Sequence, residues 1–260
     1  MDHLIYTAYS GLAASMVQQR VIANNMANAQ TTGFRAELLV AAPTTIKGNG
    51  LEARALADAQ VRGASTRQGD LMQTGNPLDI ALTGDTMLTV QPQNGQAESG
   101  QAENGQSGEE AYTRRGDLAV DAGGTLINGD GLPVLGDNGP ITVPPGAKLT
   151  IAADGTVLAA EPGQANAPPQ AVGKLKLAST TGSDVEKGLD GLFRVTGGGV
   201  LPADDAARVI PGSLEKSNVN PTQVLVDMVA AQRLFDMRAR VVSTAKDNDE
   251  KSTALMGLPA

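Results

Sequence analysis

The hydrophobic pattern of the chain has a helical period at both ends and a period of two in the middle, and this contrast limits the fold more than any other sequence feature. At the N-terminus, residues 2–29 contain no proline. Apolar or small residues recur there at helical spacing, at Ile5, Ala8, Leu12, Ser15 or Met16, Ile22 and Met26. The pattern predicts one amphipathic helix that ends in the turn-forming residues 28–33.

A second helix is predicted at the C-terminus. Asn220 directly precedes Pro221, and an Asn cap followed by Pro at the first helical position signals a helix start. The following residues recur at a 4-3-4-3 spacing that is typical of coiled coils: Val224, Met228, Ala231, Phe235, Arg238, Val242 and Ala245, and then Asp249, Ser252 and Met256. The predicted helix therefore extends from Pro221 to Met256.

Each terminal helix has an apolar stripe that is too narrow to make the helix stable alone. The nearest partner surface for each helix is the other one, so the sequence predicts that the two helices pair as a coiled coil. In the alternative, each helix packs on the central part of the chain as an ordinary surface helix. Polar seam positions at Gln19, Arg238 and Asp249 predict that the ends become ordered only when neighbouring subunits complete their core.

Between the helices, apolar residues alternate with a period of two. The pattern is seen at Leu78, Ile80 and Leu82, at Leu118 and Val120, at Ile141 and Val143, and at Leu149 and Ile151. Glycine, aspartate and asparagine separate these runs and are typical of tight turns. Short antiparallel strands are therefore predicted for the middle of the chain.

These patterns predict an α+β fold that is mainly β. We expect a terminal helical coiled-coil domain at 1–32 and 218–260, an extended connector region at 33–75 and 201–217, and a β-rich domain at 76–200. Residues 92–110 are polar and without an apolar anchor, so a flexible loop is predicted there. Residues 161–169 are predicted to be a second exposed connector.

Residues that could carry catalysis are sparse. His3 is the only histidine and the chain has no cysteine, which excludes His-based triads, multi-His metal sites and thiolate chemistry. Turns at Asp121, Asp130, Asp137 and Asp154 lack the spaced oxygen ligands and the final glutamate of an EF-hand loop. The sequence thus predicts no enzyme, no cofactor and no metal.

The charge and hydropathy of the chain limit its partners. The net charge is −8, and no basic stripe is interleaved with aromatic residues, so a nucleic-acid partner is not expected. No apolar run approaches the roughly 18–20 residues of a membrane-spanning helix. The first residues lack the basic and apolar regions of a cleaved signal peptide, so export, if it occurs, is expected to use another route.

The segment Ala23–Arg35 reads Ala-Asn-Asn-Met-Ala-Asn-Ala-Gln-Thr-Thr-Gly-Phe-Arg. It resembles the long N-terminal signature of the flagellar rod and hook proteins. Further similar blocks follow in the family's order, at 74–84, 112–118, 130–136, 215–221 and 228–233. The opening Met1–Ala8 and the short length resemble the proximal-rod members more than the distal-rod members. Two departures lie in the central domain: Thr86–Leu88 replaces the usual pair of phenylalanines, and residues 92–110 look inserted.

The resemblance implies a subunit that assembles head-to-tail into the helical rod of the flagellar basal body and transmits torque. Its partners would be itself, other rod proteins and the flagellar type III export apparatus, and its place the periplasmic rod. The terminal helices would form the inner layer and the β-rich domain the outermost. The implied assembly-interface residues are Leu12, Ile22, Asn24, Asn25, Met26, Asn28, Gly33 and Phe34, and Asn218, Asn220, Val224, Met228, Ala231, Phe235 and Val242.

Two other classes of function are open at this point. One is a β-rich hydrolase that uses acidic pairs, which would lose its activity on substitution of Asp79 or Asp117. The other is a monomeric secreted binding module whose long helices pack on its own core. The size of the protein in solution, together with the order of its helices, would separate this second class from an assembling subunit.

Overall fold

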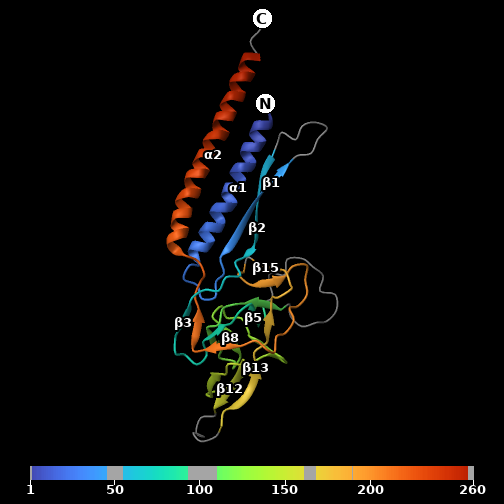
Figure 1. Ribbon diagram of the computed structural model, residues 1–260, viewed down its shortest axis with the longest axis vertical. Coiled ribbons are helices and arrows are strands. Elements are labelled where there is room, and N and C mark those ends of the chain that lie inside the picture. The colour runs from blue at the N-terminus through green and yellow to red at the C-terminus, as the bar shows by residue number, and fades with distance from the viewer. Residues whose placement is uncertain (1, 46–54, 93–109, 161–167, 189, 257–260) are drawn as a thin grey trace. The chain divides into compact units, whose positions relative to one another are not determined.

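The computed structural model describes residues 2–45, 55–92, 110–160, 168–188 and 190–256 (Figure 1). These residues form one helix near each end of the chain and eighteen strands between the helices. The prediction of a mainly β fold of the α+β class is therefore confirmed. Most of the predicted loop at 92–110 and of the predicted connector at 161–169 lies outside the described residues.

The chain divides into two compact units. The helical unit comprises Met1–Ala29, Ala36–Ser65 and Val219–Ala260, and the β-rich unit comprises Gln30–Arg35 and Thr66–Asn218. The chain therefore passes from one unit to the other four times, at residues 29–30, 35–36, 65–66 and 218–219.

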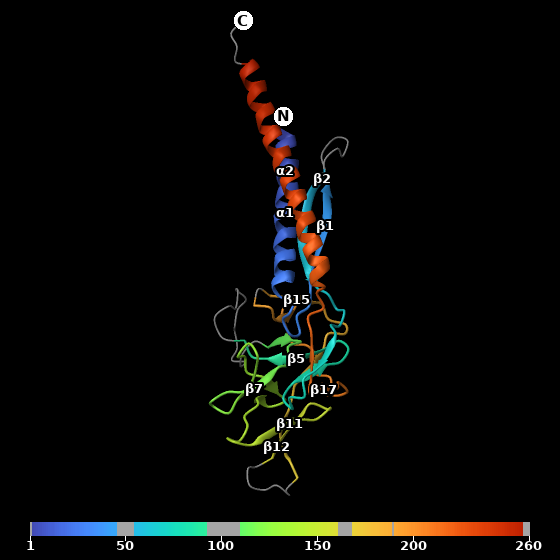
Figure 2. The ribbon, with the colours of Figure 1, turned by 90° about the vertical axis from the view of Figure 1, so that its left-hand side faces the viewer.

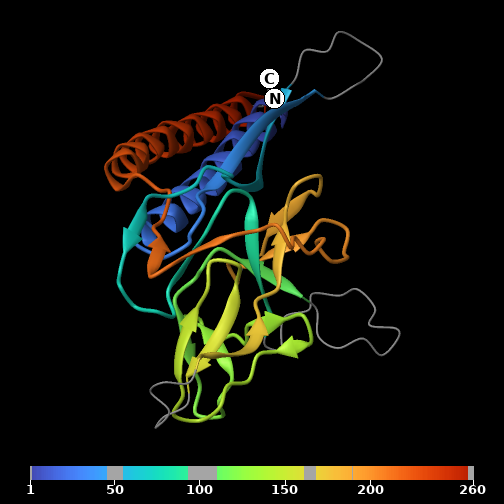
Figure 3. The same cartoon turned by 60° about the horizontal axis from the view of Figure 1, so that its bottom comes forward.

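The helical unit contains α1 (Asp2–Ala27), α2 (Pro221–Met256) and a hairpin of β1 (Glu37–Thr45) and β2 (Ala55–Ala64). Figures 1 and 2 show α1 beside α2, with the start of α1 and the end of α2 pointing the same way, so the helices are antiparallel. The hairpin packs along α1, as Figure 3 also shows. The predicted start of α2 is confirmed, because the Asn220 side-chain oxygen accepts hydrogen bonds from the amides of Thr222 (3.0 Å) and Gln223 (3.2 Å).

The region 33–75, predicted to be a single extended connector, is divided between the units. Its central part belongs to the helical unit, where β1 and β2 form the hairpin. The part after residue 65 belongs to the β-rich unit, where β3 (Leu71–Gln73) pairs with β18 (Ser213–Glu215). The second predicted connector, 201–217, is likewise paired, since β17 (Val209–Pro211) is joined to β4 (Ile80–Leu82). Ladder hydrogen bonds therefore join parts of both segments to strands of the fold.

The β-rich unit consists of small antiparallel sheets. The largest has the strand order β14 (Leu177–Ser179), β5 (Thr86–Val90), β6 (Ala111–Thr113), β16 (Phe193–Val195) and β15 (Val185–Lys187). A three-stranded sheet has the order β11 (Lys148–Ile151), β12 (Thr156–Ala160) and β13 (Gln170–Lys174). Two further pairs are β7 (Leu118–Val120) with β8 (Leu126–Asn128), and β9 (Leu135–Gly136) with β10 (Gly139–Pro140). The predicted short antiparallel strands are thus present.

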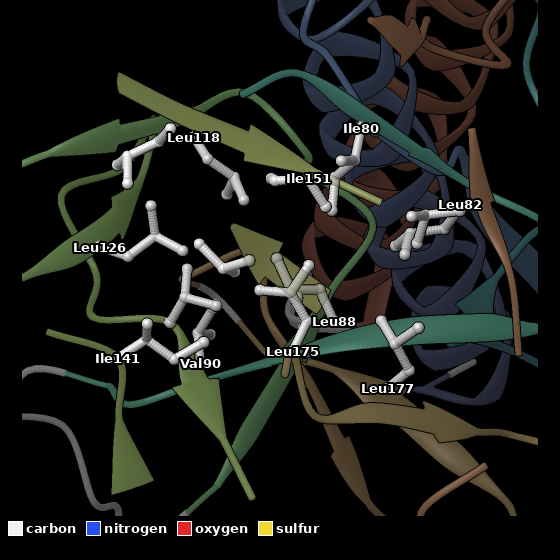
Figure 4. Close-up of a cluster of buried hydrophobic side chains, with 14 of the residues drawn as sticks. Ile80, Leu82, Leu88, Val90, Leu118, Leu126, Ile141, Ile151, Leu175 and Leu177 are labelled. Carbon is white, nitrogen blue, oxygen red and sulfur yellow. The ribbon is translucent and has the colours of Figure 1, made fainter. Parts of the chain in front are cut away.

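One hydrophobic core joins these sheets. The alternating residues Ile80, Leu82, Leu118, Ile141, Val143, Leu149 and Ile151 all belong to it. Figure 4 shows side chains from several strands pointing toward one another in this cluster. Val120 differs from the alternation, because it is 38% exposed at the end of β7, where the chain enters the turn at 121–124. Thr86–Leu88, the departure from the family pattern, is buried in β5.

Tyr112 supplies a buried polar link within this unit. Its side chain is fully buried, its hydroxyl accepts a hydrogen bond from the Leu201 amide at 2.7 Å, and it donates one to the Glu110 carboxylate at 3.3 Å. Burial raises the pKa of the Tyr112 hydroxyl above its ordinary value. The neutral hydroxyl is therefore the form that the folded state favours.

The substitution Tyr112→Phe is expected to lower the free energy of unfolding by about 1–3 kcal/mol, because the Leu201 amide keeps its burial and loses its acceptor. Since folding raises the pKa of Tyr112, the wild type should lose stability as the pH rises above about 10. The phenylalanine variant should lose less over the same range. Urea unfolding at pH 7 and above pH 10 measures both effects, and parallel alkaline losses would contradict the assignment.

Candidate assembly surface

The first part of the predicted interface is the side of α2 that faces α1. Of the predicted C-terminal residues, Ala231 is buried, Val224, Phe235 and Val242 are half-buried, and Met228 is 37% exposed. Ala245, which continues the same spacing, is also buried. The 4-3-4-3 spacing therefore marks the covered side of α2.

Polar groups are placed between the helices. The Arg238 guanidinium donates to the main-chain oxygen of Gly11 at 2.7 Å and to the Ser15 hydroxyl. Nearer the other end of the pair, the Gln19 and Gln232 side chains lie 3.4 Å apart, nitrogen to oxygen. Polar partners at single seam positions favour one register of pairing over others, at a cost in stability.

On α1, the predicted residues Leu12, Ile22 and Met26 are half-buried. The more deeply buried residues of this helix are Ser15 and Val21, at 1% and 4% exposure. Val21 is not among the predicted interface residues. Its spacing of four from Asn25, which is also buried, is the signal that could have identified it.

Two asparagines of the family-like signature, Asn24 and Asn25, hold α1 to the start of the hairpin. The Asn25 side chain accepts a hydrogen bond from the Glu37 amide at 2.8 Å and donates one to the Glu37 main-chain oxygen at 3.1 Å. Asn24 donates to the Glu37 carboxylate, and Asn28 donates to the Asn24 main-chain oxygen at 2.9 Å. These three predicted interface residues thus serve contacts within one subunit.

Three more predicted residues lie in the β-rich unit. Gly33 has a φ of +68°, and its amide donates to the Glu215 main-chain oxygen at 2.7 Å. The buried Phe34 ring lies 3.5 Å from the Lys187 ammonium, within the range of a cation–π contact. The Asn218 amide donates to the Phe34 main-chain oxygen at 3.2 Å. Asn220, by contrast, is the exposed cap of α2 in the helical unit.

A second side of α2 is apolar and exposed. Leu225, Val226, Val229, Met237 and Val241 are between 48% and 59% exposed. With 3.6 residues per turn, Val226 and Met237 lie on the opposite side of the helix from Ala231 and Phe235. Other exposed large apolar residues of the helical unit are Tyr6, Tyr9 and Met16 on α1 and Leu38, Val40 and Val61 on the hairpin.

This second side, which we name the outer stripe of α2 (Leu225, Val226, Val229, Met237 and Val241), is absent from the sequence prediction, although its apolar residues are visible in the sequence. The exposed Arg233 and Arg240 lie on the same side of the helix, so the outer stripe is apolar with basic residues among it. Large apolar side chains gathered on the exposed side of a helix commonly mark a protein interface. The arrangement can therefore serve cohesion between subunits rather than chemistry.

The acidic residues of the hydrolase alternative are engaged by their neighbours. The Asp79 carboxylate, 6% exposed, accepts hydrogen bonds from the Thr74 hydroxyl at 2.6 Å and from the side-chain nitrogen of Asn76 at 2.8 Å. The Asp117 carboxylate pairs with the Arg115 guanidinium at 2.7 Å. Among the residues that the structure describes, no group of three His, Cys, Asp or Glu could hold a metal ion. Within the same residues, neither helix has the length and apolar character needed to span a bilayer.

Comparisons with known proteins agree with the sequence blocks. Three family descriptions match: "Flagella basal body rod protein" at residues 5–35, "Flagellar hook protein FlgE/F/G D1 domain" at 101–159, and "Flagellar basal body rod FlgEFG protein C-terminal" at 210–255.

Full-length relatives match as well. The chain is 42% identical to the flagellar basal-body rod protein FlgF of Escherichia coli (strain K12) over 264 residues, which cover 99% of the chain and 100% of the relative. It is 40% identical to FlgF of Salmonella typhimurium, with the same coverage. The flagellar basal-body rod protein FlgG of Caulobacter vibrioides is 31% identical over 92% of the chain and 94% of the relative.

Proposed function

The chain belongs to the flagellar basal-body rod protein family, and we propose that α1 and α2 form a coiled-coil pair whose outer stripe packs against the helices of neighbouring subunits. The protein is a structural subunit of the flagellar basal body and, like its relatives, not an enzyme. The observation that carries the proposal is the outer stripe of α2, whose five apolar residues are about half exposed in one subunit.

Within the family, the position of the proximal-rod protein FlgF is favoured over that of the distal-rod paralogue FlgG. The chain is more similar to the FlgF proteins of Escherichia coli and Salmonella than to the FlgG protein of Caulobacter. The opening residues of the chain and its short length favour the same choice.

Assembly through α2 explains how a subunit of this kind builds a filament. The covered side of α2 is used within one subunit, whereas its outer stripe is free to contact another copy. When one surface of each subunit contacts a different surface of the next, the subunits form an open helical filament, provided that the rotation from one subunit to the next does not close a ring. Helices packed on both sides resist bending and twisting, so the rod transmits torque. In the rod, the helical unit would form the inner layer and the β-rich unit the outer one.

The remaining parts of the proposal concern partners and place. The subunit would contact its own copies and other rod proteins, and the assembly residues are those named for the two helices and for the segments next to them. Passage to the periplasmic rod would use the flagellar type III export apparatus.

Hydrogen exchange on the isolated subunit and on assembled rods tests this proposal. In the isolated subunit, amides of about residues 4–29 and 224–256 should exchange rapidly, because α1 and α2 share a narrow seam that contains Arg238, Gln19 and Gln232. Amides of residues 78–82 and 118–120 should stay protected in both samples. In rods the helical amides should become protected. Equal protection of the helices in the two samples would contradict assembly-coupled ordering and leave the family assignment intact.

A further inference from the structure

A buried cluster of three charged side chains, none of them among the predicted assembly residues, lies in the β-rich unit. The Glu215 side chain has no solvent exposure, and its carboxylate is 2.9 Å from an Arg35 guanidinium nitrogen and 2.5 Å from an Arg114 guanidinium nitrogen. The two arginine side chains are only 4% and 2% exposed. A third donor, the Gly69 amide, lies 3.0 Å from the same carboxylate. One carboxylate thus gathers two cations and a main-chain amide.

The two arginines extend this cluster to further main-chain groups. Arg114 donates to the main-chain oxygens of Leu82 (2.9 Å), Gly84 (2.7 Å) and Thr86 (2.6 Å), which span the connection from the end of β4 to the start of β5. Arg35 donates to the main-chain oxygen of Thr66. Burial, followed by the nearby Arg114 charge, lowers the pKa of the Arg35 guanidinium. The cluster therefore connects the core of the unit with segments that lie far apart in the sequence.

Glycine allows two of these segments to come close. A Cβ on Gly33 would lie 2.5 Å from the Arg114 main chain, and a Cβ on Gly69 would lie 1.9 Å from the Lys216 main-chain oxygen. Main-chain hydrogen bonds tie the same segments together, from the Gly33 amide to the Glu215 oxygen at 2.7 Å and from the Lys216 amide to the Asp70 oxygen at 2.8 Å. The Asn218 side chain donates to the Arg67 oxygen at 2.7 Å.

The tied segments are those that lead to the helical unit. Residues 30–35, 66–70 and 213–218 stand directly beside the four points at which the chain passes between the units. We propose that Arg35, Glu215 and Arg114 form a clamp that holds all four covalent connections at one place in the β-rich unit. Force on the helices then reaches the β-rich unit through this clamp. This last step rests on the proposed role in torque transmission, whereas the clamp itself does not.

The chemistry of the cluster fits a clamp better than a simple contribution to stability. Replacing a buried ion pair by apolar residues of similar volume is often neutral or stabilising, so burial of three charges is weak support for a stabilising role. Removing one partner alone, however, leaves an uncompensated buried charge. Loss of Glu215 would leave two buried guanidinium groups close together, so the segments they hold should separate first.

Hydrogen exchange on the isolated subunit tests the clamp. In Glu215→Gln, the amides of Gly33, Gly69, Lys216 and Asn218 should exchange at least about tenfold faster than in the wild type. The core amides of Leu126, Val143 and Leu175, which are bonded within the sheets and turns, should keep their rates. Asp190→Asn is the matched control: it removes one carboxylate from the Arg194 ion pair in the same unit and should change neither set.

Two outcomes would overturn the clamp: unchanged rates at the four clamp amides, or an equal rise at the core amides, which would make the cluster part of global stability. Should Glu215→Gln fail to fold, Arg35→Lys, which keeps the charge balance, should show the same split to a smaller extent. Failure of both variants to fold would also overturn the clamp, because the cluster would then belong to the core.

Force transmission has its own readout in cells that carry Glu215→Gln or Asp190→Asn. The Glu215→Gln cells should swim more slowly than the control cells as the viscosity of the medium rises. Equal swimming at all viscosities would overturn the transmission step. The hydrogen-exchange experiment uses the isolated subunit, so unchanged exchange rates at the clamp amides contradict the clamp even if rods assemble. Conversely, if assembly through α2 fails, the exchange rates expected for the clamp stay the same.

Discussion

Replacing Met237 by aspartate should abolish swimming while leaving the unfolding of the isolated subunit unchanged. Met237 is 57% exposed in one subunit, so the new carboxylate remains hydrated there. In the rod, the helices of a neighbouring subunit would cover position 237, and burying an unpaired carboxylate costs several kcal/mol. This cost recurs at every subunit contact along the rod. Swim-agar assays and sedimentation of rods measure the first effect, and thermal unfolding of the purified subunit measures the second.

Met237→Leu is the control, because it keeps an apolar side chain of similar size and should swim as the wild type does. Phe235→Asp tests the opposite side of α2. Phe235 is half-buried in the 4-3-4-3 seam, so its replacement should also abolish assembly. Normal swimming with Met237→Asp would contradict the outer stripe as an interface, and normal swimming with Phe235→Asp would contradict the coiled-coil seam.

The substitution Leu82→Ala should produce the largest loss of stability in the β-rich unit, about 2–5 kcal/mol. Leu82 is fully buried in β4, belongs to the common core and pairs with Val209 of β17. Shortening its side chain removes apolar contacts and leaves a cavity between sheets that cannot close freely. A loss of this size is a large part of the roughly 5–15 kcal/mol that stabilises a typical protein.

Leu71→Ala is the matched control for this loss. Leu71→Ala removes the same atoms as Leu82→Ala in the same unit, but Leu71 is 47% exposed in β3. Its replacement should change the free energy of unfolding by no more than about 0.5 kcal/mol. Urea unfolding followed by a probe of the β-rich unit compares the two variants. Equal losses would show that the core in Figure 4 is not what stabilises this unit.

Much of the fold follows from local sequence. The start of α2 was predictable because the Asn220 side chain reaches amides only two and three residues away. The core strands were predictable where alternation coincides with burial, as at Ile80 and Leu82. The family was predictable because its blocks are long and keep their order along the chain.

Other features depend on residues that are distant in the sequence. The hairpin of β1 and β2 pairs with itself, but α1 provides the surface on which it packs, so its place in the helical unit could not be deduced from 33–75 alone. The asparagines of the signature were predicted to serve assembly, which stays a prediction, whereas the contacts of Asn24 and Asn25 with Glu37 of the same subunit were not foreseen. The outer stripe of α2 became identifiable once α1 had been seen to cover the other side.

The sequence by itself determined the two terminal helices, the β-rich middle and the family, because caps, turns and hydrophobic periods act over a few residues. Tertiary structure alone decided that Arg35, Arg114 and Glu215 meet in a buried cluster. Charged residues are ordinarily exposed, so no local pattern marks these three as interior. Their burial is tolerable only because segments separated by many residues bring opposite charges and main-chain oxygens together, and that proximity exists only in the folded chain.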